Sequence, residues 1–522
     1  MQLERKNLAF LPLLDGELSA ALNNYSEETD QAYQNVESSP SVTPSIRQKT
    51  LHEKRSQTEI VQNTVYATKR VSLVMFSNWF HRRVWQGYLS RAFREGALFR
   101  TLLSEMRERE KWPREKLVEW QDARLREILL EASAHVPYYR RLFKEIGLDV
   151  SRVPAREALS RIPLLDKSFV RRSPDQFLNE KYHRMFLKKA HTSGTTGTPL
   201  VCYRDRYAVN YEHAMIWRQW LWAGYGFGER RVTLRGELIV PTSQKTPPFW
   251  MYSPAEKQLL MSSYHISEDT LPLYVETIRS FAPAAVEGYP SSVYLIARGF
   301  EKLGYKSFPV KGVFTSSETL LDYQRELIER IFRCRIFDLY GNTERTAAIG
   351  NCEQGVYHEF SDYAIIEYVP SETGDMEIVG TPLFNKAFIL LRYRSGDFAV
   401  PGTEPCSCGR AFPTVKSLEG RKESYVWTPE GRAVGRLDHI FKGTHHIRES
   451  QIIQEAIDHV RILVVPDPDF SEADEKQILQ NARERLGPSM KVSVERVLDI
   501  PRTSRGKFVA VISKLANHDE RR

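Results

Sequence analysis

Residues 192–199, Thr-Ser-Gly-Thr-Thr-Gly-Thr-Pro, combine five hydroxyl side chains with two glycines and a closing proline. Glycines let a turn bring backbone N–H groups close to an anion, and hydroxyls can donate hydrogen bonds in the same direction. The run lacks the Gly-Lys-Ser/Thr ending of a Walker P-loop. It lies between an apolar stretch at 185–187 and a strand-like stretch at 200–203. This setting favours a phosphate-binding loop over the alternative, a flexible Ser/Thr/Gly linker.

Three later segments carry polar side chains that suit a nucleotide site. A predicted strand ends at Tyr340, and the following Glu344 and Thr343 could bind Mg²⁺ and a phosphate oxygen. Asp397 follows a predicted tight turn and could bind ribose hydroxyls. Lys507 lies on a Gly-containing loop and could act as a mobile point charge. Each segment alone fits a surface turn, but their joint occurrence in this order argues against that explanation.

Three cysteines and one histidine form a candidate metal site. Cys352 and His358 flank a glycine turn, and Cys406 and Cys408 form a C-x-C pair. Three thiols and one imidazole are the ligand count of a closed, structural zinc site. The C-x-C spacing is not the common zinc-knuckle spacing, so free cysteines are the alternative.

Composition limits the class of protein. A chain of 522 residues can form two or three domains with full cores, and 41% hydrophobic and 27% charged residues are ordinary for a soluble globular protein. Five cysteines argue for a reducing compartment, and Cys202 and Cys334 match no motif and are predicted to be small core residues. The early apolar run is too short for a signal peptide or membrane span, which predicts a cytoplasmic protein.

The net charge of +8 comes from 74 basic and 66 acidic residues. Much of the basic excess lies between residues 82 and 126, where the signs alternate, which favours a solvated helix face over a nucleic-acid patch. No aromatic-and-basic repeat or zinc-finger spacing occurs, so no nucleic-acid partner is predicted.

The sequence predicts four regions. Residues 1–70 are rich in small polar residues and are predicted to be a flexible extension. Residues 71–125 are predicted to be helical, packed on the main body rather than lying in a membrane interface, so no stable membrane insertion is expected. A large domain at 126–420 is followed by a small domain at 421–522. A helix is expected from 124 to a stop near Pro137.

Within the large domain, short strands alternate with helices, which predicts an α/β fold with a parallel sheet. The expected strands are 232–234, 284–288, 312–315 and 336–340, and the expected helices are 271–281, 291–303 and 320–332. Between 363 and 400 the pattern changes to the antiparallel strands of a β subdomain. In the small α+β domain, a helix is expected over 472–486 and a strand over 491–497.

Taken together, these motifs resemble those of the adenylate-forming superfamily of acyl-CoA ligases, peptide-synthetase adenylation domains and luciferases. The matching motifs are residues 192–199, 340–344, 393–397, 420–421 and 501–507. The chain is most similar to the phenylacetate-CoA ligase family and its branch associated with capsule biosynthesis, through 136–140, 162–167, 288–291 and 435–439. The similarity extends from about residue 112 to 515.

The resemblance implies that a small-molecule carboxylic acid attacks the α-phosphate of ATP, yielding an acyl-adenylate and pyrophosphate. Carboxylates are ionised at neutral pH, so no general base is needed, and catalysis comes from positioning and charge neutralisation. The small domain would be a mobile lid that rotates after adenylation about a pivot at Glu423.

The resemblance also assigns roles to individual residues. Glu344 would coordinate Mg²⁺, Asp397 would bind the ribose, and Arg421 would support the nucleotide. Lys507 would bridge the substrate carboxylate and the α-phosphate region. The phosphates would be held by Thr192, Ser193, Gly194, Thr195, Thr196 and Gly197, with Thr196 also in the catalytic set. The rest of the nucleotide would contact Ser316, Ser317, Glu318, Tyr340, Gly341, Asn342 and Thr343.

Other features bear on the acid, the acceptor and the metal. In relatives the acyl pocket includes the segment that here contains Gly288 and Tyr289; Tyr289 would suit an aromatic ring or pack in the core. Leu200 replaces the lysine that many members place there, so the cation is expected largely from Lys507. The Cys/His set matches a structural zinc site of several relatives.

Three functions remain open. An acid–CoA ligase is ranked first, and a tailoring enzyme that passes the acyl group to an amine, hydroxyl or carrier-protein thiol second. A catalytically inactive binding module is third. A predicted hairpin at 425–434, with its turn at 429–431, departs from the plain ligase pattern, so the identity of the acyl acceptor remains open. A homodimer is also an open alternative.

Overall fold

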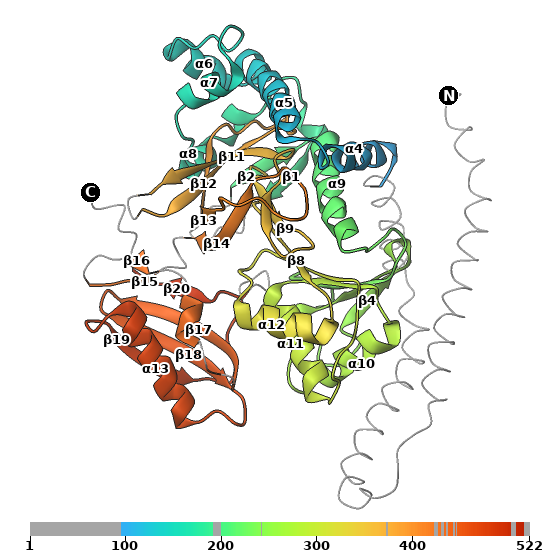
Figure 1. Cartoon of the computed structure of the whole chain (residues 1–522), viewed down its shortest axis with the longest axis vertical. Helices are drawn as coiled ribbons and strands as arrows, with labels where there is room; N and C mark the ends of the chain where they lie inside the picture. Colours follow the sequence, from blue (N-terminus) through green and yellow to red (C-terminus); the bar gives the residue numbers. More distant parts are fainter. Residues whose placement is uncertain are drawn as a thin grey trace, which may run out of the picture.

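The computed structural model describes most of the chain after residue 94. The described residues are 95–191, 200–237, 239–241, 243–371, 374–421, 426–429, 433–434, 437–441, 444, 446–502 and 508–515. They form a large body around one broad sheet and a small carboxyl-terminal domain, which lies beside α11 (Pro290–Lys302) and α12 (Asp322–Phe332) (Figure 1). The predicted extension at 1–70 and the first part of the predicted helical segment, 71–94, lie outside the described residues.

A layer of helices comes first in the described chain. Its members are α4 (Ala97–Arg109), α5 (Arg114–His135), α6 (Pro137–Glu145), α7 (Ala155–Arg161) and α8 (Lys167–Arg172). In α5 the buried Leu125, Ile128 and Leu129 recur at helical spacing. The helix predicted from 124 is only the second half of α5. The predicted stop near Pro137 is confirmed, because α5 ends at His135. Pro137 then occupies the first turn of a new helix, α6, where its missing N–H has no intrahelical partner to lose.

A twelve-stranded sheet runs through the large body in the order β11-β12-β13-β14-β10-β9-β8-β7-β6-β3-β5-β4. The strands are β3 (Arg231–Leu234), β4 (Trp250–Ser253), β5 (Gln258–Met261), β6 (Ala285–Gly288), β7 (Gly312–Ser316), β8 (Ile336–Gly341), β9 (Ala348–Asn351), β10 (Tyr357–Glu359), β11 (Ala364–Pro370), β12 (Met376–Pro382), β13 (Tyr393–Pro401) and β14 (Thr414–Arg421). A separate pair is formed by β1 (Lys188–His191) and β2 (Val201–Arg204).

The predicted parallel sheet is confirmed, because β8, β7, β6, β3 and β5 pair in parallel. The predicted antiparallel strands also occur, as β11, β12 and β13. They do not form a separate subdomain sheet, because β9 and β10 connect them by hydrogen bonds to β8. The large body therefore has one continuous mixed sheet.

Helices cover both faces of the parallel strands. Because side chains alternate along a strand, Val313 of β7 faces α10 (Leu271–Phe281), α11 and α12, and its neighbour Phe314 faces α4 and α9 (Arg206–Trp222). The strands are buried on both faces, as expected for a parallel sheet, but they also carry buried polar residues such as Arg231, Glu287 and Asp338.

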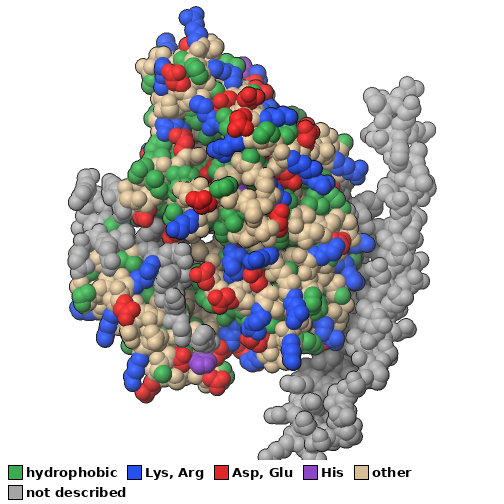
Figure 2. All heavy atoms as spheres, viewed as in Figure 1, with side chains coloured by type: hydrophobic (Ala, Val, Ile, Leu, Met, Phe, Trp, Pro, Cys, Tyr) green, Lys and Arg blue, Asp and Glu red, His purple; other side chains and the backbone are tan. Residues whose placement is uncertain are grey.

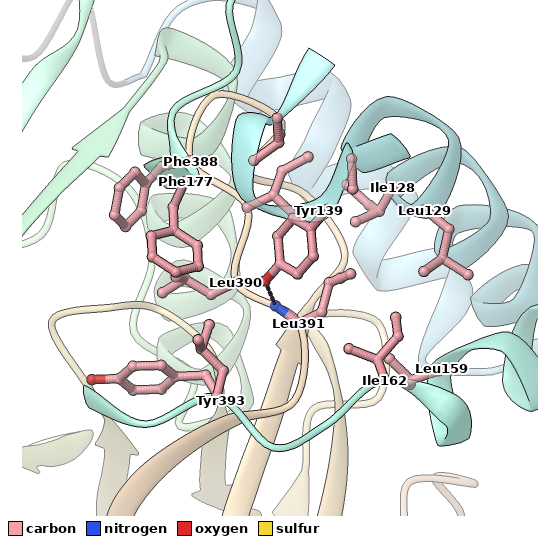
Figure 3. Packing of buried hydrophobic residues seen from close by; sticks show 14 of the residues in the cluster. Ile128, Leu129, Tyr139, Leu159, Ile162, Phe177, Phe388, Leu390, Leu391 and Tyr393 are labelled. Carbon is pink, nitrogen blue, oxygen red and sulfur yellow. Dashed lines mark hydrogen bonds between the residues drawn. The ribbon is translucent and has the colours of Figure 1, made fainter. Parts of the chain in front are cut away.

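A second core joins the helical layer to the strand that enters the site (Figure 3). Tyr139 of α6 is buried at its centre among residues that include Ile128 and Phe177. The backbone N–H of Leu391 donates to the Tyr139 hydroxyl at 2.7 Å. Tyr393, the first residue of β13, belongs to the same core. Packing of α5 to α7 thus fixes the position from which β13 starts.

A fully buried ion pair ties α9 to the chain before β11. Arg218 and Asp362 are both inaccessible to solvent, and two guanidinium nitrogens donate to the two carboxylate oxygens at 2.6 and 3.0 Å. The rings of Phe360 and Phe412 lie 5.0 and 5.1 Å from the guanidinium carbon. Paired charges can be buried in this way, but removing one partner leaves the other uncompensated.

We expect Asp362→Asn to lower the free energy of unfolding by about 3–5 kcal/mol, because it leaves the buried Arg218 charge with only the Glu110 carboxylate, 3.9 Å away. Chemical denaturation followed by tryptophan fluorescence measures the change. Glu157→Gln, in the exposed pair with Arg161, is the matched control and should cost less than about 1 kcal/mol. An equally small cost for Asp362→Asn would contradict the prediction.

The carboxyl-terminal domain is a four-stranded sheet with one long helix in its described residues. Its elements are β17 (Ile447–Ala456), β18 (His459–Pro466), α13 (Glu472–Leu486), β19 (Lys491–Arg496) and β20 (Val511–Ser513), and the strand order is β19-β18-β17-β20. The predicted helix over 472–486 is confirmed. It starts at a capping box in which Ser471 and Asp474 bond each other's backbone N–H groups. The predicted hairpin is present as β15 (Val426–Trp427) and β16 (Ala433–Val434).

Acidic and basic side chains are intermingled over the face shown in Figure 2. Within the described stretches, none of the helices combines the length and apolar character needed to cross a bilayer.

Candidate functional site

The carboxyl ends of four neighbouring strands bring the predicted site residues to one edge of the sheet. In spatial order β8 ends near Tyr340, β7 at Ser316 and β6 at Gly288, and β3 is followed by Arg235. Ligands of open α/β sheets bind outside these ends. The sheet therefore places residues of three predicted motifs side by side.

Glu344 is the most enclosed acidic group of the site. It is 5% exposed, and its Oε1 accepts a hydrogen bond from the Tyr393 hydroxyl at 2.7 Å. The Lys167 ammonium lies 3.1 Å from the same oxygen. Burial raises the pKa of Tyr393 well above its usual value, so the phenol stays protonated as a donor at neutral pH. Glu344 is thus a buried, oriented carboxylate beside a lysine.

Short backbone bonds place Lys167 at this point. Leu165 forms an isolated parallel bridge with Tyr393. The Leu165 N–H donates to the Arg392 carbonyl at 2.9 Å, and the Arg394 N–H donates to the Leu165 carbonyl at 3.0 Å. The bridge therefore holds Leu165 beside the start of β13. Lys167, the first residue of α8, follows two residues later and lies close to Glu344. Lys167 had been noted in the sequence only as part of the family resemblance.

The turn after β8 is held by hydrogen bonds within the turn and by one from Arg204 of β2. The Asn342 side chain accepts from the Thr346 N–H at 2.8 Å and donates to its hydroxyl at 2.7 Å. Arg204, at the end of β2, donates to the Thr343 carbonyl. Because β2 begins two residues after the predicted phosphate loop, Arg204 connects the strand that follows that loop to the turn that carries Glu344.

Tyr340 and Asp397 meet although they come from different strands. The Tyr340 hydroxyl donates to Asp397 Oδ2 at 2.8 Å, and the Asp397 N–H donates to Ser395 Oγ at 3.0 Å. The predicted tight turn before Asp397 is wrong: the residues belong to the continuous strand β13, with Gly396 at φ +73° and a register shift just beyond. A positive φ is cheap for glycine, so an irregularity in the strand rather than a turn presents the carboxylate.

Glu318 is bonded by backbone N–H groups from both parts of the molecule. Its oxygens accept from the Ser291 N–H at 3.1 Å and from the Phe508 N–H at 2.7 Å. Burial raises the pKa of Glu318. Its neighbour Ser317 has φ +73°, a strained value for a residue other than glycine. Phe508 directly follows Lys507, so Glu318 anchors the segment that carries the predicted catalytic lysine.

Further ion pairs join the carboxyl-terminal domain to the large body. Arg298 of α11 pairs with Asp467, and Arg448 of β17 lies 2.7 Å from Glu268. With the Glu318 contact, these pairs hold the small domain against the edge of the sheet that carries the site.

The predicted metal ligands converge from three separate loops and strands. One ligand atom from each of Cys352, His358, Cys406 and Cys408 lies within 4.8 Å of all the others. The Cys352 and Cys406 sulfurs are 3.7 Å apart, and His358 Nε2 is 3.5 Å from the Cys408 sulfur. His358 Nδ1 is 3.1 Å from the Phe412 carbonyl, which orients the ring so that Nε2 faces the thiols. This cluster could hold a metal ion with four protein ligands.

The other two cysteines behave largely as expected. Cys202 is buried in the core of Figure 3, and Cys334 is partly buried against the core under α12. Neither takes part in the metal-binding cluster.

Some predicted residues cannot be placed. Thr192, Ser193, Gly194, Thr195, Thr196 and Gly197, the pivot Glu423 and Lys507 lie outside the described residues, and Arg421 is described only by its backbone. Among the described residues, the structure brings together Tyr340 with Asp397 and Thr343 with Glu344. Gly288 is closely packed, since a Cβ there would lie 2.7 Å from the Leu234 carbonyl oxygen. Tyr289 is only 8% exposed.

Comparisons with known proteins agree with this geometry. Residues 426–514 match the family described as the CapK C-terminal domain. Protein CapK of Staphylococcus aureus is 25% identical over 403 residues, covering 75% of this chain and 88% of that protein. A phenylacetate-coenzyme A ligase of Thermus thermophilus is 25% identical over 388 residues, covering 71% and 83%. A crystal structure of 2-hydroxyisobutyryl-CoA ligase in the postadenylation state superposes with a TM-score of 0.63 at 17% identity, covering 78% and 91%.

Fold and homology together define the class: the chain has the fold of an adenylate-forming CoA ligase and is similar in sequence to phenylacetate-CoA ligases. More particularly, it is a homologue of CapK and of the phenylacetate-CoA ligases, and it carries a CapK C-terminal domain. The predicted fold class and family resemblance are thereby confirmed.

Proposed function

We propose that this protein uses ATP to activate a small carboxylic acid as an acyl-adenylate and then transfers the acyl group, with CoA as the first candidate acceptor. The observation that carries the proposal is the Glu344 environment, a buried carboxylate oriented by Tyr393 and paired with Lys167 at the carboxyl edge of the sheet. Its relatives include phenylacetate-CoA ligases, which supports acid activation followed by thioester formation.

The residues divide the chemistry between them. Glu344 would hold Mg²⁺, which neutralises charge on the phosphates when it is bound. Lys167 adds a cation beside that carboxylate, so the proposed site would have a second lysine in addition to Lys507. Asp397, positioned by Tyr340, is the proposed ribose ligand. Residues 192–197 are the proposed phosphate loop, and Arg421 the nucleotide support. No proton needs to be removed from the acid, because carboxylates are ionised at neutral pH.

The small carboxyl-terminal domain would act as a lid and supply the catalytic lysine. We assign it to residues 421–522, with Glu423 as the pivot and Lys507 as the lysine that reaches the α-phosphate region. The Phe508 N–H bond to Glu318 supports this, since it holds the segment next to Lys507 against the ends of β6 and β7. On this proposal, the described arrangement would be a lid closed for the first half-reaction.

The test is pyrophosphate exchange into ATP with a panel of carboxylic acids, repeated as AMP release with CoA added. Acid-dependent exchange supports the first half-reaction, and CoA-dependent AMP release supports CoA as acceptor. Exchange with no acid in a broad panel would contradict the proposal and favour the binding-module alternative.

A second candidate is transfer to an amine, hydroxyl or carrier-protein thiol. The observation that favours it is the match of the lid to the CapK C-terminal domain, with its hairpin of β15 and β16. In a two-step enzyme whose lid forms the acceptor site, a different lid points to a different acceptor. Exchange without any CoA-dependent release would support this candidate.

We propose that the Cys/His cluster binds zinc and acts structurally. Its spacing supports this, because sulfur and nitrogen ligands of tetrahedral zinc stand about 3.3–3.8 Å apart, given bond lengths of about 2.1–2.3 Å. Four protein ligands leave no open position for catalysis. Bound zinc would connect the chain after β9 to the loop before β14.

Purified protein is expected to contain about one equivalent of zinc, and Cys408→Ser is expected to lose most of it. Mass spectrometry of metals measures both. Cys334→Ser, outside the cluster, is the matched control and should keep the metal. Less than about half an equivalent in the unmodified protein, or full retention by Cys408→Ser, would contradict the assignment.

A further inference from the structure

Arg235 occupies a position that the proposed chemistry does not use. It follows β3, two strands away from β7, and its Nη2 lies 3.0 Å from Ser316 Oγ and 3.0 Å from Glu287 Oε1. Its side chain is 39% exposed. Its Nε is shielded from solvent and has no hydrogen-bond partner within the described part of the chain. Nη2 is therefore held by two partners, the enclosed Nε has none, and part of the side chain remains open to solvent.

The charge of Arg235 is only partly compensated. Glu287 is 8% exposed and is shared, since its Oε2 also lies 3.0 Å from Arg231 Nε and accepts from Thr233 at 3.1 Å. Arg231 is equally buried. A second carboxylate, that of Glu256, lies near Arg231, with its Oε2 3.9 Å from Arg231 Nη2. Of the two guanidiniums that share Glu287, only that of Arg235 reaches solvent.

The backbone around Arg235 is fixed by neighbouring hydroxyls. Ser263 Oγ donates to the Arg235 carbonyl at 3.0 Å, and the Tyr264 hydroxyl donates to the Gly236 carbonyl at 3.0 Å. A positioned guanidinium of this kind is the group that proteins use to bind carboxylates and other oxoanions through paired hydrogen bonds.

The strand order places Arg235 relative to the nucleotide residues. The ends of β8 and β7 carry Tyr340 and Ser316, and the ends of β6 and β3 come next along the same edge. An acid whose reacting carboxylate lies near the α-phosphate would extend along these ends, toward the guanidinium. Tyr289, which directly follows β6, is packed at 8% exposure, whereas the Arg235 side chain at the neighbouring strand end is 39% exposed.

We propose that Arg235 binds a second carboxylate of the acyl substrate, so that the acid activated by this protein is a dicarboxylate rather than an apolar aryl acid. This inference rests on the proposed function, because it assigns the specificity of the same site. Arg235 is a specificity residue and takes no part in the transfer itself.

The experiment compares matched acids that differ only in the second carboxylate, butyrate with succinate and valerate with glutarate, in pyrophosphate exchange. In the unmodified protein we expect kcat/KM to favour the dicarboxylates at least about 10-fold, the value of one charge-assisted contact. Arg235→Gln should remove that preference, mainly by raising KM for the dicarboxylates, while exchange with monocarboxylates stays within about 2-fold. Arg235→Lys should retain part of the preference for dicarboxylates, because lysine keeps the positive charge but lacks the paired N–H donors of the guanidinium.

Arg230→Gln, an exposed arginine one residue before β3, is the matched control and should keep the preference. Preference for monocarboxylates in the unmodified protein, or equal loss for both classes in Arg235→Gln, would overturn the inference. Thermal stabilisation by the same acids separates it from the proposed function. If no acid supports exchange, stabilisation by dicarboxylates that Arg235→Gln abolishes still supports the Arg235 site, and its absence overturns both.

Discussion

Lys507→Ala is expected to slow acyl-adenylate formation about 10²–10³-fold, the typical effect of removing one group that stabilises charge in the transition state. The hydrogen bond from the Phe508 N–H to Glu318 supports this expectation, because it holds the residue after Lys507 at the carboxyl edge of the sheet, where the nucleotide is proposed to bind. Pyrophosphate exchange with the preferred acid measures the effect. The acyl-transfer half-reaction, started from synthetic acyl-adenylate, should change little, because the proposed rotation of the lid would by then have moved Lys507 away.

Lys514→Ala is the matched control for this prediction. Lys514 lies on the same lid, is half-exposed and pairs with Glu455 at 2.7 Å, far from the proposed chemistry. It should leave exchange unchanged. Near-normal exchange by Lys507→Ala would exclude Lys507 from the adenylation step, and an equal loss in both half-reactions would indicate a general defect of the lid.

Glu344→Gln is expected to reduce exchange about 10²-fold and to raise the Mg²⁺ concentration needed for half-maximal rate. Glutamine keeps the shape of the side chain and can still accept from Tyr393, so the loss reports on the negative charge. The variant also leaves Lys167 without its counter-charge 3.1 Å away. Exchange measured across a magnesium titration separates weaker metal binding from a slower chemical step.

Glu301→Gln is the control for that variant, because Glu301 is half-exposed on α11 and pairs with Arg330 away from the site. It should leave both the rate and the magnesium dependence unchanged. If Glu344→Gln showed an unchanged magnesium dependence together with a large loss of thermal stability, the carboxylate would be a structural partner of Lys167 and not the metal ligand.

Much of the fold could be predicted from local patterns. The alternation of short apolar strands with amphipathic helices predicted β3, β6, β7 and β8 and the helices between them within a few residues. The feature that was wrong depends on context. A glycine before Asp397 can make a turn or an irregular strand, and here pairing with β12 and β14 keeps the strand continuous.

The site shows the same division. Glu344, Tyr340, Asp397 and the four candidate metal ligands could be chosen from their residue types and motif order. Tyr340 lies near the end of β8, Glu344 lies in the turn after it, Asp397 lies within β13, and the candidate metal ligands form one cluster. Lys167 and Arg235 could not be assigned in this way. The missing lysine at Leu200 was a signal that another cation was needed, but nothing in the local pattern indicated Lys167.

The sequence by itself determined which chemical groups are present, the elements that carry them and the family they resemble, because these are properties of short segments and of their order. Only the tertiary structure decided the partnerships: Lys167 with Glu344, Arg235 with Ser316, and Glu318 with the backbone of Phe508. Each joins segments far apart in the chain, and each depends on sheet order and on the packing of helices against it. Local sequence patterns do not specify which distant segments come into contact, so the arrangement of side chains at the carboxyl edge of the sheet is set only by the folded structure.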